Sequence, residues 1–335
     1  MKKNKFQLTL AAAVIGLVFS IAACAGHTPS ATNAGDAPTR QAGAQQAGDV
    51  IVSPAGIAAA WIPAGTFTMG SPDDEIGRFD NEGPQRQVTI SEGFWMGVFP
   101  VTQAQWERVM GNNPSHFHAN PAAGETQSRR PVETVSWYDA LEFANRLSIL
   151  EGLEPAYSIN GSTNPDDWGD VPTNRNVIWD AVEIVAGSNG WRLPTEAQWE
   201  FAARAGTTTA FSNGAADWQD IALIDGIGWF NLNAGSMTRE VGLKQPNPWG
   251  LYDIHGNVFE WVWDSQAPTD PAYTPSGYHR VLRGGSWVFS AQNARSAVRF
   301  HSNPFTRNNF LGLRLVRPRE TMISVELISV SLGNH

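Results

Sequence analysis

The sequence contains a single cysteine, Cys24, in 335 residues, so it has no internal disulfide. Charged residues make up only 16% of the chain, and the formal net charge of −9 argues against general nucleic-acid binding. The sequence also lacks the Gly-x-Ser-x-Gly elbow of many hydrolases and the glycine-rich loop that binds phosphate. Its seven histidines are scattered without the paired spacing of a metal site.

Glycine, proline and tryptophan are abundant instead, with 32, 21 and 14 residues respectively. This composition indicates a loop-rich globular protein with aromatic anchors rather than a helical bundle. The length is sufficient for one large domain of about 250 residues with its own core.

The first residues predict a secreted lipoprotein. Residues 1–23 combine a basic start with an apolar run that is too short to span a membrane, which is typical of a signal peptide. Ile21-Ala22-Ala23-Cys24 resembles a bacterial lipobox, so we expect Cys24 to be the lipidated N-terminus. The alternative is a plain secretory peptide with an incidental cysteine. Residues 24–56 are rich in small and polar residues and predict a flexible tether.

Three helices have recognisable start signals. Capping boxes begin at Thr102 and Thr195, and Ser136 caps an apolar stripe at helical spacing. Short strands are expected within Trp61–Gly70 and at the following segments: Gln87–Ile90, Phe94–Val98, Trp261–Trp263, Val281–Leu282, Leu313–Val316 and, as an extra C-terminal strand, Met322–Leu332.

An ordered series of motifs resembles the formylglycine-generating-enzyme (sulfatase-modifying factor) family. The series covers most of the chain from about Ala60 to Pro318. It consists of Ile62–Gly70, Pro100–Trp106, Pro131–Trp137, Trp191–Glu200, Gly250–Trp261 and Arg283–Trp287. The resemblance implies an α+β fold of the C-type-lectin-like kind over residues 57–318, with long ordered loops, followed by a tail or extra strand at 319–335.

The enzymes that this chain resembles use two copper-binding cysteines just after Gly-Gly-Ser to oxidise their substrate. The resemblance matches those two positions to Phe289 and Ala294 in this chain. Copper(I) chemistry of this kind needs soft thiolate ligands, so we expect a protein that is not an enzyme and requires no cofactor.

Within the family, the chain is most similar to the treponemal variable lipoproteins, which a diversity-generating retroelement rewrites at adenines. A constant frame around Arg283–Trp287, Arg295–Ala297 and Gly312–Val316 alternates with short runs of aromatic, small and amide residues. Each residue type in those runs is reachable from an Asn codon through its adenines. The positions expected to vary, and to bind ligand, are Val288, Phe289, Ser290, Val298, Phe300, His301, Ser302, Phe305, Asn308, Asn309 and Phe310.

Two features of this region have a second interpretation. The phenylalanines could belong to the core, although their polar neighbours favour an exposed binding surface where alanine costs less than about 1 kcal/mol. The frame arginines Arg283, Arg295, Arg299 and Arg314 either bind anions or, as we favour, hydrogen-bond loop backbone.

A calcium site is the one metal site that the resemblance implies. Its oxygen ligands would come from Asp253, Gly256, Val258 and Glu260, with the alternative that the two carboxylates stabilise turns without metal.

Together these features predict a monomeric lipoprotein anchored at Cys24 on the outer membrane or cell surface. Its partner would be a protein or glycan on another cell or phage. The alternatives are a structural or assembly lipoprotein of the envelope with a catalytically inactive domain, and an enzyme of a new kind that uses the same cleft.

Overall fold

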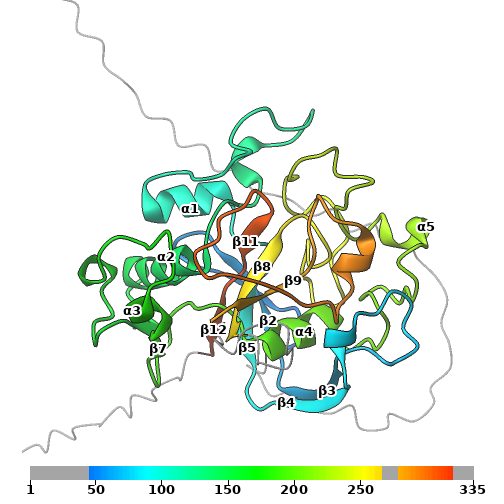
Figure 1. The fold of residues 1–335 in the computed structure, drawn as a ribbon, viewed down its shortest axis with the longest axis horizontal. Helices are drawn as coiled ribbons and strands as arrows, with labels where there is room; N and C mark the ends of the chain where they lie inside the picture. Colours follow the sequence, from blue (N-terminus) through cyan, green and yellow to red (C-terminus); the bar gives the residue numbers. More distant parts are fainter. Residues whose placement is uncertain (1–44, 266–277, 320–335) are drawn as a thin grey trace, which may run out of the picture. The chain divides into compact units, whose positions relative to one another are not determined.

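The computed structural model describes residues 45–265 and 278–319 (Figure 1). The predicted signal peptide, Cys24 and the predicted strand at Met322–Leu332 lie outside the described residues. In the two described ranges, no helix has the length and apolar character needed to cross a membrane.

Two four-stranded sheets form the centre of the domain, with strand orders β1-β2-β5-β12 and β10-β9-β8-β11. Strand β11 pairs with β8 in parallel, whereas the other pairings in both sheets are antiparallel. The first sheet contains β1 (Val50–Val52), β2 (Ala58–Ile62), β5 (Phe94–Gly97) and β12 (Val316–Pro318). The second contains β8 (Phe259–Ser265), β9 (Arg280–Arg283), β10 (Phe300–Ser302) and β11 (Leu311–Leu313).

Two small antiparallel pairs complete the strands: β3 (Gly65–Met69) with β4 (Arg86–Ile90), and β6 (Tyr157–Ser158) with β7 (Glu183–Ile184). The expected strand in Trp61–Gly70 is therefore the end of β2 followed by β3, because Pro63 and Ala64 interrupt it. The expected strand at Leu313–Val316 is also divided. The chain leaves β11 and enters β12 in the other sheet, and Arg314 and Leu315 make the crossing.

The three predicted helices are confirmed as α1 (Gln103–Met110), α2 (Trp137–Leu150) and α4 (Glu196–Arg204). Each begins with a reciprocal capping box in which the side chain of Thr102, Ser136 or Thr195 accepts from a main-chain N–H of the first turn. The shorter helical segments are α3 (Val177–Asp180), α5 (Ile221–Ile224), η1 (Asp80–Glu82), η2 (Gln127–Arg129), η3 (Pro165–Asp167) and η4 (Ala291–Ala294).

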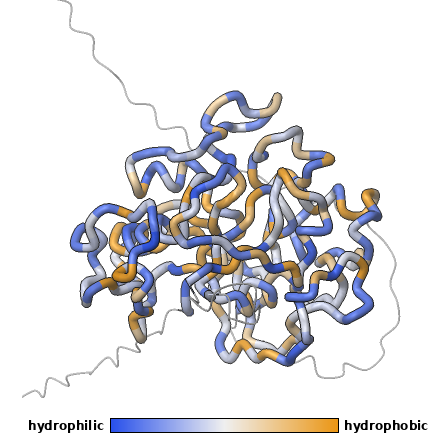
Figure 2. Tube along the Cα trace, in the orientation of Figure 1, coloured by the Kyte–Doolittle hydropathy of each residue, from blue (hydrophilic) through white to orange (hydrophobic). Residues whose placement is uncertain are grey.

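The apolar faces of the sheets and of α2 and α4 form the core. One cluster joins α2 to β8 and β11 through residues such as Trp137, Phe143 and Trp261, and another packs α4 against β2 and β5. Figure 2 shows the hydrophobic segments gathered in the middle of the domain, while much of the outer loop backbone is hydrophilic.

The tether predicted to reach residue 56 is too long. Val50, Ile51 and Val52 form β1 and pair with β2 in antiparallel register. Three β-branched residues in a row favour a strand. The prediction missed it because most other residues of this segment are small or polar.

Candidate ligand-binding face

Three runs are predicted to vary and are called the variable runs: Val288–Ser290, Phe300–Ser302 and Asn308–Phe310. Contacts of their main chain hold them in place. The carbonyl oxygens of Phe289, Asn308 and Phe310 accept hydrogen bonds from Asn231, Thr134 and Phe259 at 3.0, 2.9 and 2.8 Å. The indole N–H of Trp287 donates to the carbonyl of Asn309 at 2.9 Å. The middle run is β10, at the edge of its sheet beside β9. These contacts use backbone atoms of the variable residues, so an exchange of side chains leaves them in place.

The phenylalanines of the three runs meet in one aromatic cluster. The rings of Phe289 and Phe300 lie 5.5 and 5.2 Å from the buried ring of Phe259, and Phe310 lies 5.5 Å from Phe289. All three, together with Phe305, are partly exposed and pack against the main core. They therefore belong both to the surface and to the edge of the core, so neither interpretation of the sequence describes them completely.

The remaining side chains of the runs lie further out. Val288 is 39% exposed and Asn308 is also exposed, while Ser290, His301, Ser302 and Asn309 are partly exposed. Among the residues that the structure describes, the side-chain amides of Asn308 and Asn309 have no hydrogen-bond partner. These amides are therefore available to a ligand.

Val298 is a correction to the predicted set, because its side chain is completely buried. Its main-chain N–H donates to the carbonyl of Arg295, and its own carbonyl accepts from the guanidinium of Arg283. This turn places the side chains of Val298 and Ala297 in the interior. Val298 therefore packs beneath the surface and is not accessible to a ligand.

Three frame arginines, Arg283, Arg295 and Arg314, hydrogen-bond loop backbone, as predicted. Arg283 donates to the carbonyls of Ser296 and Ala297 at 3.1 and 2.9 Å, as well as to Val298. Arg314 donates to the carbonyls of Gly97, Val98 and Tyr252, and so connects the two sheets. Arg299 differs, because it makes a bidentate ion pair with Glu196 at 2.8 and 2.6 Å.

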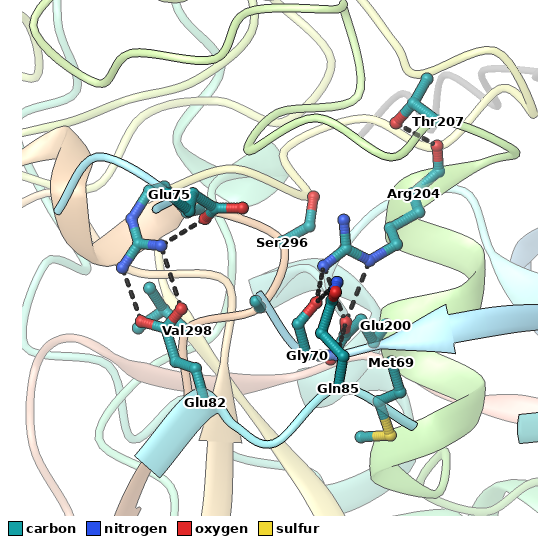
Figure 3. Close-up of polar contacts among 12 residues, drawn as sticks. Met69, Gly70, Glu75, Glu82, Gln85, Glu200, Arg204, Thr207, Ser296 and Val298 are labelled. Atoms are coloured by element: carbon teal, nitrogen blue, oxygen red, sulfur yellow. Dashed lines mark hydrogen bonds and ion pairs between the residues drawn. The ribbon is translucent and has the colours of Figure 1, made fainter. Parts of the chain in front are cut away.

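The sequence did not indicate that the buried arginines have carboxylate partners. Arg283 contacts Glu200, and Arg295 binds Glu82 with both terminal nitrogens and also contacts Glu75. Figure 3 shows Glu75 and Glu82 around one guanidinium, and Glu200 with Arg204, whose guanidinium also donates to the carbonyl of Gly70 at 2.9 Å. Burial raises the pKa of Glu75.

The two carboxylates that the resemblance assigns to calcium are engaged by protein donors. Both carboxylate oxygens of Glu260 accept from Arg314, and one also accepts from the indole N–H of Trp199 at 2.7 Å. Asp253 is buried and accepts from the main-chain N–H of Gly242 at 2.8 Å, and burial raises its pKa to about 6. A cation would have to displace the guanidinium of Arg314 from Glu260. Gly256 and Val258 are buried too. The contacts of Asp253 and Glu260 favour the alternative in which the two carboxylates stabilise the backbone without metal.

The positions aligned with the redox cysteines are filled by other contacts. The ring of Phe289 belongs to the aromatic cluster, and Ala294 is buried with its carbonyl 2.8 Å from Nδ1 of His255. Because a carbonyl only accepts, Nδ1 of His255 carries the proton, and Nε2 accepts from the hydroxyl of Ser212 at 2.9 Å. Burial lowers the pKa of His255 to about 4. Nothing in the sequence distinguishes this buried histidine from the others.

The described domain is therefore an α+β, loop-rich domain of the formylglycine-generating-enzyme type. The chain belongs to the family of the sulfatase-modifying factor enzyme 1-like domain, whose model matches residues 53–319.

Named relatives include both an enzyme and other proteins. The chain is 37% identical to "Chaperone protein LppX" of Paenibacillus barcinonensis, over 70% of this chain and 83% of that protein. It is 29% identical to the formylglycine-generating enzyme of Mus musculus, over 76% of this chain and 73% of the enzyme. Among solved structures, Treponema denticola variable protein 1 superposes with a TM-score of 0.70 at 38% identity, covering 81% of this chain and 99% of that one.

Proposed function

We propose that this protein is a surface-displayed lipoprotein that binds a ligand through the variable runs, and that a retroelement diversifies those runs. The observation that carries the proposal is the separation between backbone and side chains. Constant residues hold the carbonyls of Phe289, Asn308 and Phe310, whereas side chains such as Val288 and Asn308 are exposed. A domain built in this way accepts new side chains without losing its fold.

The chemistry of the runs suits a binding surface. Aromatic side chains such as Phe289 and Phe310 bury a large area at a small cost in side-chain entropy, and amides such as Asn308 adapt their hydrogen bonds to different partners. The likeness to a treponemal protein that is itself called variable supports the same assignment.

The proposal treats the domain as a binding module and not as an enzyme. Copper-dependent oxidation requires two thiolates, and Phe289 and Ala294 occupy the corresponding positions in a chain whose single cysteine is Cys24. Binding through the variable runs requires no cofactor.

Display follows from the N-terminal sequence. A lipid on Cys24 anchors the protein to the outer membrane or cell surface, and the tether holds the domain clear of the lipid. The ligand is a protein or glycan on another cell or phage, and the lipoprotein acts as a monomer.

Diversification is tested on DNA. The genome near this gene should contain a reverse transcriptase and an imperfect copy of the DNA for about Arg283 to Val316. Mismatches between the copy and the gene should fall where the copy has adenine. A genome without the copy, or mismatches spread evenly over all bases, would contradict the proposal.

Tolerance to exchange is tested on protein. In one library, codons derived from Asn randomise the outer positions of the variable runs: Val288, Ser290, His301, Ser302, Asn308 and Asn309. In the control library, the same codons replace Arg283, Arg295 and Arg314, which are fully buried. We expect folded, secreted protein frequently from the first library and rarely from the second. Equal yields of folded protein would show that the runs are no more exchangeable than the frame.

A second candidate function is assembly of other envelope proteins by a catalytically inactive domain. The likeness to a protein named as a chaperone, at 37% identity, favours it. Two results together would support this function over ligand binding. The genome would lack the imperfect copy of the DNA for about Arg283 to Val316, and deletion of the gene for this protein would leave a secreted partner misfolded.

A further inference from the structure

A pocket of about 460 Å³ lies between α1 and α2, outside the variable runs. Its walls come mainly from Trp106, Val109 and Met110 of α1 and from Asp139, Glu142 and Arg146 of α2. The volume lies within the range of about 300–1,000 Å³ that is usual for small-molecule sites.

The pocket borders the third variable run. Thr134 and Arg307 both line it, and the main-chain N–H of Thr134 donates to the carbonyl of Asn308 at 2.9 Å. Arg307 directly precedes Asn308 in the chain. A ligand bound across Asn308 would therefore lie next to the opening of this pocket.

One wall of the pocket is apolar and rigid. The ring of Trp106 stacks on Phe143 of α2 with centroids 4.8 Å apart, and its indole N–H donates to the side chain of Asn112 at 3.3 Å. Val109, Met110 and Val171 also line the pocket. This surface suits an aliphatic chain and does not need to rearrange to receive one.

The polar wall is balanced in charge. The carboxylates of Asp139 and Glu142 face the guanidinium groups of Arg307 and Arg146. Both carboxylate oxygens of Asp139 already accept hydrogen bonds, which come from Ser136 and from two nitrogens of Arg307.

Glu142 differs from Asp139. Its Oε1 accepts from Nε of Arg146 at 2.7 Å, and its Oε2 has no donor among the residues that the structure describes. The Glu142 side chain lines the pocket and is 15% exposed, so a hydrogen bond to Oε2 would be partly shielded from water.

We propose that this pocket receives a lysine side chain of a protein ligand, with the aliphatic stem against Val109, Met110 and Val171 and the ammonium on Oε2 of Glu142. The proposal rests on the proposed function, because the ligand of the variable runs supplies the lysine. None of the pocket residues belongs to those runs, so the pocket is a constant subsite. It selects protein ligands with a lysine beside the variable contact, whatever side chains the runs present.

The probe is Nα-acetyl-lysine methylamide, whose side-chain ammonium is free. It is titrated into the purified protein, and binding is followed by saturation-transfer NMR. The norleucine counterpart has the same stem without the charge. The probe has about 14 heavy atoms, and a typical binding free energy of about 0.3 kcal/mol per heavy atom corresponds to a Kd on the order of 1 mM. We expect the norleucine probe to bind about tenfold more weakly, because it lacks the charge-assisted hydrogen bond.

The variant Glu142→Gln should weaken lysine binding about tenfold and leave norleucine binding unchanged. Glu154→Gln, which removes the same charge at an exposed position after α2, is the matched control and should change neither. Failure of the lysine probe to bind, equal binding of the two probes, or unaltered lysine binding in Glu142→Gln would each overturn the proposal.

The outcomes also separate this proposal from the proposed function. The probes report on the pocket alone, whereas the template copy and the randomised libraries report on the variable runs. Failure of the probes alongside tolerant runs would remove the lysine subsite and leave the binding function intact. If lysine binds as expected but the runs tolerate no exchange, the pocket is a lysine site and the proposal of a variable binding face is wrong.

Discussion

Arg295 and Glu82 form a bidentate ion pair across 213 positions of chain, with nitrogen–oxygen distances of 2.6 and 3.0 Å. Both side chains are fully buried, and the same guanidinium donates to the carbonyl of Gly77 at 2.6 Å. The pair attaches the backbone that leads into β10 to the segment between β3 and β4. The position of the second variable run therefore depends on a contact that contains no variable residue.

Breaking this pair should destabilise the whole domain. Arg295→Met leaves Glu82 buried without its partner, and we expect the free energy of unfolding to fall by about 3–5 kcal/mol. Arg175→Met is the control, because Arg175 is half exposed and its pair with Asp180 should contribute about 1 kcal/mol or less. Urea denaturation measures both. A loss for Arg295→Met no larger than that of the control would show that the pair does not hold the fold.

The variable positions should fall into two classes of stability. Asn308→Ala should change the free energy of unfolding by less than about 0.5 kcal/mol, because Asn308 is exposed and its main-chain contacts remain. Phe300→Ala should cost about 2–3 kcal/mol, because the ring contacts Phe79, Phe259 and Phe289. This larger cost replaces the uniform tolerance expected from the sequence. Denaturation of the two variants tests it, and equal costs would place Phe300 on the open surface.

The features predicted correctly from sequence are mostly local. The helix caps at Thr102, Ser136 and Thr195 depend on residues a few positions away, so a single segment contains the whole signal. The fold followed from motifs spread in order along the chain, and the family match over residues 53–319 confirms it.

The errors concern partners that are distant in the chain. Nothing near Glu260 in the sequence indicates that Arg314 neutralises it, and the resemblance alone assigned Glu260 to calcium. Val298 is buried between Ala297 and Arg299, and its carbonyl accepts from Arg283 of β9, a contact that the local sequence does not reveal. Glu75, Glu82 and Glu200 gave no signal as partners of buried arginines, because charged residues normally face solvent.

Calcium should have no effect on the stability of the domain. A ligand that binds the folded state raises the melting temperature, and Glu260 is already neutralised by Arg314. We expect chelator-treated protein to melt at the same temperature with and without about 1 mM calcium in a thermal scan. Magnesium at the same concentration is the control for ionic strength. A calcium-specific rise of several degrees would restore the metal site and require Arg314 to move.

Two buried groups should make opposite contributions to the pH dependence of stability. Burial lowers the pKa of His255 to about 4, so the unfolded chain binds a proton near pH 6.5 that the folded chain excludes. The stabilisation from neutral His255 is therefore complete above about pH 6.5 and is lost as the pH falls toward 4. Burial raises the pKa of Asp253 to about 6, so protonation of the folded chain adds stability as the pH falls from about 6 toward 3.8.

Because these contributions oppose each other, the stability of the wild-type protein alone does not reveal either one. His255→Asn retains a donor for the carbonyl of Ala294 and removes the titrating ring. The difference in the free energy of unfolding, wild type minus variant, should fall by about 3 kcal/mol between pH 7 and pH 4, since one pKa unit corresponds to about 1.4 kcal/mol. For Asp253→Asn the same difference should rise over that interval. Urea denaturation at several pH values measures both, and a difference for His255→Asn that does not change with pH would mean that the folded protein protonates His255 as readily as the unfolded chain.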